Sequence, residues 1–164
     1  MSDSKFSSEN KIIDLSRLQS ISSRLRSKGK TIVTTNGAFD ILHVGHVKYL
    51  EKAKSLGDVL IVGINSDSSV RELKGKGRPI NDEKSRAIVV AALESVDYVC
   101  IFDHHLPLEF IARAFPKVHV KGGDYKVKNL PEKSFVESLG GSIKIVNFEK
   151  GFSTTSVVKK IRKG

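Results

Sequence analysis

Two histidines, His43 and His46, have the residue type and the spacing to bind phosphate. They stand three positions apart around Gly45, shortly after an apolar segment at residues 31–35. On a helical turn both imidazoles point the same way, and the glycine lets an anion approach the backbone. The N–H groups and dipole of a helix start favour phosphate, and imidazoles donate hydrogen bonds to its oxygens. The alternatives are simple helix capping and a surface metal pair, for which no third ligand lies nearby in the sequence.

A second segment suited to phosphate begins at residue 153. Four consecutive hydroxyl residues, Ser153-Thr154-Thr155-Ser156, follow an apolar segment at residues 143–147. At a helix start they offer side-chain and backbone donors to an anion. One hydroxyl would suffice to cap a helix, so capping explains Ser153 but not the cluster. Together with the histidine pair, the cluster predicts two helix N-termini that face one polyphosphate.

The remaining candidates follow other apolar segments. Lys74, Lys76, Arg78 and Arg86 form a basic segment spaced by glycines, for which a solvated charged loop is the alternative. Gly122-Gly123-Asp124-Tyr125 is a tight turn whose glycines allow a ligand to pass close to the backbone. A simple turn at the end of a strand explains the same residues. These segments extend the predicted anion site without fixing its chemistry.

Two residues of the first loop also have more than one interpretation. Asp40 could stabilise a turn or steer a Mg²⁺-bound phosphate, and Phe39 fits packing better than ligand contact. The chain has neither a P-loop, nor a G-x-G-x-x-G fingerprint after a strand, nor a G-x-S-x-G elbow. The single Cys100 excludes an internal disulfide and a cysteine-rich zinc site. What remains is phosphate chemistry without a covalent nucleophile.

Alternating apolar strands and helical patterns must position these side chains. The expected strands cover residues 31–35, 59–64, 98–102, 117–121 and 143–147. The expected helices cover residues 12–28, 44–56, a short stretch after 65–67, 82–94 behind an Asn81 cap, 108–115, 132–139 and 154–162. This alternation predicts a doubly wound α/β fold with a five-stranded parallel sheet. We expect a polar tail and helix at 1–30, one domain at 31–164, and a ligand beyond the carboxyl ends of the strands.

Composition limits the function classes. The 164 residues carry a net charge of +10, concentrated in residues 1–30, 71–90 and 151–164. The absence of a long apolar run and of an N-terminal apolar stretch predicts a soluble, cytoplasmic protein without membrane association. The charge suits nucleic acid, an anionic membrane surface or phosphorylated small molecules. Because the chain lacks Trp and an alternating basic–aromatic stripe, we expect no nucleic-acid partner, and an RNA-binding module is the remote alternative.

His43-Val44-Gly45-His46 and Ser153-Thr154-Thr155 resemble the two signature motifs of the H-x-G-H nucleotidyltransferase superfamily, which has a Rossmann-like, cytidylyltransferase-like fold. Within it, the chain is most similar to the adenylyltransferases of ADP-heptose synthesis. The stretches that carry this similarity are 35–43, 65–67, 73–75, 78–81, 121–125 and 153–155. The resemblance covers residues 31–162 and implies transfer of AMP from ATP to D-glycero-β-D-manno-heptose 1-phosphate, giving ADP-heptose and pyrophosphate.

Departures from a neighbouring family support this branch. Glycerol-3-phosphate cytidylyltransferases place an Arg shortly before the hydroxyl motif, where this chain has Asn147-Phe148-Glu149-Lys150, and Thr where it has Ala38. A cytidylyl- or adenylyltransferase for another acceptor, such as glycerol 3-phosphate or flavin mononucleotide, is the alternative. Many relatives carry a sugar kinase in the same chain. This chain has none, so the resemblance implies a separate kinase that makes the sugar 1-phosphate. Because relatives commonly dimerise, the resemblance also implies a homodimer.

The resemblance also assigns roles to residues of this chain. The implied catalytic residues are His43, His46, Lys74 and Arg86. The implied nucleotide-binding residues are Asn36, Gly37, Phe39, Asp40, Lys76, Gly122, Gly123, Asp124, Ser153, Thr154 and Thr155. The implied acceptor-binding residues are Asn65, Asp67 and Arg78, and Lys74, Lys76 and Arg86 are expected to form a mobile basic lid. No residue is assigned to metal, because Mg²⁺ is expected to be held through the phosphates and water.

Overall fold

The five strands form one parallel sheet in the order β3-β2-β1-β4-β5. The computed structural model describes residues 7–123 and 126–163. The strands are β1 (Ile32–Gly37), β2 (Val59–Asn65), β3 (Tyr98–Phe102), β4 (Val118–Gly122) and β5 (Ser142–Val146). Each expected strand is therefore confirmed to within two residues at either end, and so is the doubly wound architecture.

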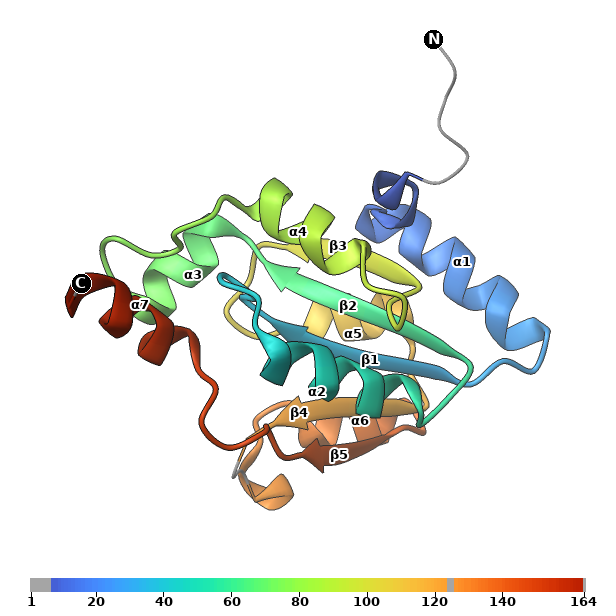
Figure 1. The fold of residues 1–164 in the computed structure, drawn as a ribbon. Coiled ribbons are helices and arrows are strands. Elements are labelled where there is room, and N and C mark those ends of the chain that lie inside the picture. The colour runs from blue at the N-terminus through green and yellow to red at the C-terminus, as the bar shows by residue number, and fades with distance from the viewer. Residues whose placement is uncertain (1–6, 124–125, 164) are drawn as a thin grey trace, which may run out of the picture.

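Helices cover both faces of the sheet (Figure 1). The α-helices are α1 (Leu15–Ser27), α2 (Val44–Lys54), α3 (Asp67–Lys74), α4 (Glu83–Ala91), α5 (Leu108–Ala114), α6 (Lys133–Ser138) and α7 (Thr154–Lys163), and the 3₁₀ turns are η1 (Ser8–Lys11) and η2 (Val127–Asn129). The apolar faces of α2 and α4 pack on one side, and those of α1, α5 and α6 on the other. Two hydrophobic cores result.

Strand β1 shows how the alternation of a buried strand serves both cores. Ile32 packs among the residues of the α1–α5 side, and Val33 among those of the α2–α4 side. Thr34 and Thr35 continue this alternation with polar contacts: the Thr34 hydroxyl lies 2.8 Å from His119 Nδ1, and the Thr35 hydroxyl lies 2.6 Å from the Tyr49 hydroxyl. Buried hydroxyls are satisfied in this way on both faces.

The N-terminal segment is joined closely to the sheet. Ile12 forms a parallel bridge with Val99 of β3. The Lys11 ammonium donates to the carbonyls of Leu93 and Val96, at 3.2 and 2.8 Å. The apolar face of α1 packs in the same core as α5. The expected helix at 12–28 is thus present as α1, three residues shorter at its start.

The helix expected at 82–94 is also present, but its cap is not the predicted one. Asp82, not Asn81, caps α4, because its carboxylate accepts from the Ser85 N–H at 2.9 Å. The Asn81 side-chain amide instead donates to the Asp40 carbonyl at 2.8 Å. The helix ends at Ala91, since the Leu93 N–H bonds to Val90 in a tighter turn that leads to β3.

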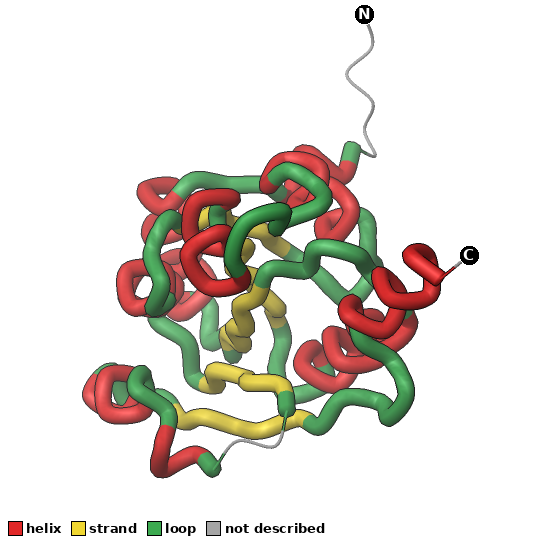
Figure 2. The backbone as a smooth tube through the Cα atoms, turned by 90° about the vertical axis from the view of Figure 1, so that its left-hand side faces the viewer, coloured by secondary structure: helices red, strands yellow, loops and turns green. Residues whose placement is uncertain are grey.

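The order of the strands creates one switch point, between β1 and β4. From β1 the chain proceeds to β2 and β3 on one side, and then returns to place β4 and β5 on the other. Figure 2 faces the carboxyl edge of the sheet, with the strands surrounded by helices and loops. Loops diverge at such a point and leave a crevice for a ligand. The candidate residues therefore have to be sought at the ends of β1 and β4.

Candidate active site

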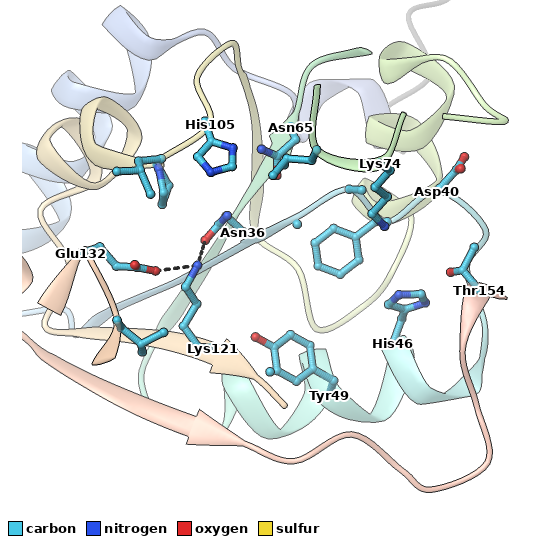
Figure 3. A pocket seen from close by; sticks show the side chains of 18 of the residues that line it. Asn36, Asp40, His46, Tyr49, Asn65, Lys74, His105, Lys121, Glu132 and Thr154 are labelled. Carbon is cyan, nitrogen blue, oxygen red and sulfur yellow. Dashed lines mark hydrogen bonds and ion pairs between the residues drawn. The ribbon is translucent and has the colours of Figure 1, made fainter. Parts of the chain in front are cut away.

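A cavity of about 450 Å³ opens at this switch point. Its walls come from the ends of β1, β2 and β4, from α2, α3 and the first turn of α7, and from the loops after β3 and β4 (Figure 3). The predicted site residues among its walls are Asn36, Gly37, Phe39, Asp40, His46, Asn65, Lys74, Gly122 and Thr154. Segments more than 100 positions apart in the sequence thus meet at one site.

The two histidines stand together at the start of α2. His43 is the N-cap of the helix, and the centroid of its ring lies 3.9 Å from that of His46. His46 Nδ1 accepts the His43 backbone N–H at 3.3 Å. Because hydrogen-bonded Nδ1 is the acceptor, the hydrogen of a neutral His46 stands on Nε2, and this group can donate to a phosphate oxygen in the cavity.

Burial favours the uncharged form of both imidazoles. It lowers the pKa of His46 to about 4, with smaller contributions from the neighbouring His43 and Lys74, and it also lowers the pKa of His43. His46 is therefore neutral at pH 7, and a polyanion beside the pair would favour its protonation.

Gly45 is required by this close arrangement. A Cβ atom at this position would lie 2.9 Å from the His43 ring and 3.1 Å from the Phe152 Cβ. The Phe152 ring stacks against His43, with centroids 6.4 Å apart. A side chain at residue 45 would therefore displace either the first histidine or the segment that leads into α7.

The hydroxyl residues at the start of α7 make different contacts. The Ser153 side chain accepts from the Ser156 N–H at 3.0 Å, which is the capping interaction expected of it. Thr154 lines the cavity, and its hydroxyl donates to the Ile41 carbonyl at 3.4 Å, in the histidine loop. Thr155 is exposed and does not line the cavity. Two helix starts therefore face one cavity, as the sequence predicted.

Members of the basic segment occupy different environments. Lys74, at the end of α3, lines the cavity, and burial together with Arg78 and Arg86 lowers its pKa. Lys76 is exposed in the loop that follows. Arg78 does not line the cavity, but it pairs with Asp40, which does, at 3.3 Å. Of this segment, Lys74 is the member that the structure brings to the site.

Asp40 holds the loop after α3 in place. Its buried carboxylate accepts the N–H groups of Ile80 and Asn81 at 2.8–3.0 Å, in addition to the pair with Arg78. Of the two roles considered for Asp40, turn stabilisation is the one its contacts fit. Phe39, also buried, belongs to the core and lines the cavity as well, so packing and ligand contact are compatible for this ring.

Arg86 is a buried residue of helix α4 whose side chain joins several loops through hydrogen bonds. Its guanidinium donates to the carbonyls of Asn81, Ala38 and Asn65, and its Nη2 pairs with Asp67 at 2.8 Å. Its exposed fraction is 1%, and it lies in α4. This corrects its expected place in a mobile lid, because the group is fully engaged by the ends of β1 and β2. Its catalytic role stays a prediction.

The end of β4 contributes a backbone wall. Gly122 lines the cavity, and the Phe148 ring lies directly over its Cα, where any Cβ would collide with it. Gly123 has a φ of 112° and donates its N–H to Val146 at 3.3 Å, so it serves the strand exit and does not line the cavity. Asp124 lies outside the described residues.

Several cavity residues were not singled out as site residues from the sequence. The Tyr49 hydroxyl bridges Thr35 and the Val120 carbonyl at the floor. Lys121 pairs with Glu132 at 2.6 Å, and Leu73, His105, Leu106, Pro107, Leu130, Pro131 and Phe148 complete the walls. Lys121 stands next to the Gly122-Gly123 turn, and this position in the sequence could have identified it as a candidate site residue. No sequence pattern identifies Glu132, because it approaches Lys121 only in the folded chain.

The acidic side chains at the cavity do not fit a protein-held Mg²⁺. Asp40 is engaged by two N–H groups and Arg78, and Glu132 by Lys121. Among residues 7–123 and 126–163, no three His, Cys, Asp or Glu side chains gather as a metal site.

In the same part of the chain, no helix is long and apolar enough to cross a membrane.

Known proteins resemble this chain in sequence and in fold. The model of the family described as cytidylyltransferase-like matches residues 34–160. Two proteins called bifunctional protein HldE, from Geobacter metallireducens and Geotalea uraniireducens, are 53% identical over 154 residues and 51% identical over 157. These alignments cover 94% and 96% of this chain but 31% and 32% of the relatives. The chain therefore spans about a third of their length.

Two solved structures share the arrangement of strands and helices. A lipopolysaccharide core biosynthesis protein from Thermoplasma volcanium is 33% identical, with a TM-score of 0.64 over 76% of this chain and 100% of that chain. A pantoate-beta-alanine ligase from Francisella tularensis is 17% identical, with a TM-score of 0.57 over 93% of this chain and 78% of that one, and shows the fold alone. On its sequence match and the fold that carries it, the chain belongs to the cytidylyltransferase-like family of nucleotidyltransferases.

Proposed function

We propose that the chain transfers AMP from ATP to D-glycero-β-D-manno-heptose 1-phosphate, releasing pyrophosphate and forming ADP-heptose. The observation that carries the proposal is the meeting of two helix starts, at His43–His46 and at Thr154, on one cavity at the switch point. This arrangement suits a polyphosphate. The similarity to bifunctional HldE proteins supports the heptose acceptor.

The reaction requires alignment more than it requires a base. A phosphate oxygen of the acceptor attacks the α-phosphorus of ATP, and the bond from that phosphorus to the bridging oxygen of pyrophosphate breaks. The acceptor phosphate is mostly ionised at pH 7, because its second pKa is about 6. The site must bring two anions together and stabilise charge on the leaving pyrophosphate.

The cavity cations and donors supply this stabilisation in the proposal. His46, Lys74 and Thr154 contact the triphosphate, and His43 supports His46 from the helix cap. Asn36, Gly37, Phe39 and Gly122 form walls of the nucleotide site. Lys76, Gly123, Ser153 and Thr155, which do not line the ligand-free cavity, would have to approach on binding. Mg²⁺ would supply further charge neutralisation through the phosphates, and no protein ligand is assigned to it.

Buried polar groups position these contacts. Arg86 ties the loop of β1 to the end of β2 and to Asp67, and Asp40 ties the same loop to residues 78–81. Arg78 therefore acts through Asp40, while Asn65 lines the cavity and is held by Ser69 at 3.0 Å. A homodimer and a kinase activity that supplies the acceptor belong to this proposal and stay predictions.

Pyrophosphate release tests the proposal. The purified chain is incubated with ATP or CTP and with heptose 1-phosphate, glycerol 3-phosphate or flavin mononucleotide, and the nucleotide product is identified by mass. We expect ADP-heptose with ATP and heptose 1-phosphate, at a higher kcat/KM than for any other pair. Preferential turnover of CTP, or of another acceptor, would contradict the proposal and identify the alternative.

A further inference from the structure

Lys121 and Glu132 form a charged pair at the end of the cavity away from the two helix starts (Figure 3). The Lys121 ammonium lies 2.6 Å from Glu132 Oε1 and donates to Asn36 Oδ1 at 3.0 Å. Lys121 is the next-to-last residue of β4 and Asn36 the next-to-last of β1, so the pair stands at the switch point itself. Nothing in the phosphate motifs accounts for it.

The burial of Glu132 makes the pair more than a surface contact. Glu132 is 1% exposed, whereas an ordinary carboxylate stays in water. Burying a carboxylate is unfavourable unless a cation compensates its charge. Lys121, with a side chain 19% exposed, provides that cation and still reaches the cavity. The carboxylate therefore fixes the ammonium group against the cavity wall.

The positions of the lysines in the cavity indicate what the Lys121 ammonium group could bind. Two lysines line the cavity: Lys74 on the side of the triphosphate contacts, and Lys121 on the opposite side. His46 and Thr154 lie on the Lys74 side. Adenylyl transfer needs a second anion, the acceptor phosphate, next to the α-phosphate. A fixed cation between the two would offset their repulsion.

We infer that Lys121 binds the attacking phosphate of the acceptor, and that buried Glu132 is the positioning residue that holds its ammonium group there. This inference rests on the proposed function. In the transfer, the acceptor oxygen forms its bond to the α-phosphorus while the bond to pyrophosphate breaks, and Lys121 keeps its protons. Asn36 restrains the ammonium group from β1. The pair thereby selects acceptors that present a phosphate at this end of the cavity.

Binding measurements on variants test the inference. Lys121→Met is titrated by calorimetry with heptose 1-phosphate, and separately with inorganic phosphate, in the presence of a non-hydrolysable ATP analogue. We expect acceptor binding to weaken roughly 100-fold, the scale of losing a charged contact, with the affinity for the ATP analogue unchanged. Lys144→Met, an exposed lysine on neighbouring β5, is the matched control and should bind both ligands normally.

Glu132 requires a separate readout. Glu132→Gln keeps the size of the side chain but removes its charge, so it should raise the KM for the acceptor more than it changes kcat or the KM for ATP. Should Lys121→Met fail to fold because Glu132 is left unpaired, the double variant Lys121→Met/Glu132→Gln removes both charges and is measured in its place. Circular dichroism and thermal unfolding establish that each variant is folded.

The outcomes separate this inference from the proposed function. Parallel loss of acceptor and ATP-analogue affinity would assign Lys121 to the nucleotide and overturn the inference, as would unchanged acceptor binding. A wild-type chain that binds inorganic phosphate through Lys121 beside the ATP analogue, but transfers AMP to no sugar 1-phosphate, contradicts the proposed function alone. Turnover of heptose 1-phosphate that is indifferent to Lys121 and Glu132 contradicts the inference alone.

Discussion

The rings of His43 and His46 lie with their centroids 3.9 Å apart at the start of α2, and only one of the two lines the cavity. His46 faces the cavity, while His43 is the N-cap residue of the helix and its ring lies between those of His46 and Phe152. A motif that looks symmetrical in sequence therefore places one histidine on the cavity wall and the other behind it, at the start of the helix.

Replacing His46 should affect catalysis directly. We expect His46→Ala to lower kcat by roughly 100-fold or more, because a donor to charge that develops in the transition state is lost. Pyrophosphate release under saturating substrates measures the effect. His105→Ala, which changes an exposed imidazole elsewhere on the cavity wall, is the comparison, and near-wild-type turnover by His46→Ala would contradict the assignment.

Acid should destabilise the fold through its buried histidines. Burial lowers the pKa of His46 to about 4 and that of His119 to about 3, whereas both have pKa values near 6.5 when unfolded. Between pH 6.5 and 4 the unfolded chain thus binds more protons than the folded one, so the free energy of unfolding falls as the pH falls.

Urea unfolding at several pH values measures this dependence. Replacing His119, whose Nδ1 lies 2.8 Å from the Thr34 hydroxyl, removes one of the two groups. His119→Asn should therefore be less stable than the wild type at pH 7 but show a shallower loss of stability between pH 6.5 and 4. An equally steep loss in the variant would show that His119 is not protonated on unfolding.

Arg86 should matter for stability as well as for turnover. Arg86→Met removes a buried guanidinium and leaves three carbonyl groups and the partly exposed Asp67 carboxylate without their donor. We expect a loss of about 3–5 kcal/mol in the free energy of unfolding, as for other broken buried ion pairs. Denaturant titration measures it, with the exposed Lys84→Met on the same helix as control. A stable but inactive variant would instead favour direct phosphate contact.

Gly45 should be sensitive to a single methyl group. Gly45→Ala places Cβ 2.9 Å from the His43 ring, so the imidazole has to move away from His46. We expect kcat to fall while the melting temperature changes little, since alanine favours the helix. Glu51→Ala, an exposed change on the same helix, should leave kcat unaltered.

Two substitutions of Thr154 separate the role of its hydroxyl from the role of its packing. Thr154→Val keeps the shape and removes the hydroxyl that lines the cavity, so the KM for ATP should rise about 10-fold, the scale of one hydrogen bond to a charged group. Thr154→Ser retains the hydroxyl and should restore most of the affinity. Equal effects of both substitutions would assign the residue to packing.

Most elements of this fold were predictable from local patterns. The near-continuous apolar run at residues 59–64 indicated a strand covered on both faces, and the spacing of apolar residues at 44–56 indicated a helix; the structure has them as β2 and α2. The cap of α4 was assigned to Asn81, not to Asp82, because both residue types cap helices and their competition is decided by contact with Asp40.

The sequence by itself determined the strand-and-helix alternation, the two helix starts and the phosphate-binding residue types, because these depend on neighbours within a few positions. Only the tertiary structure decided which of the candidate phosphate-binding residues line the cavity. Arg86 was grouped with Lys74 by its charge, yet it is buried against the ends of β1 and β2. Glu132 and Lys121 form a pair whose significance lies in burial, and burial depends on contacts between segments that the chain brings together only when it folds.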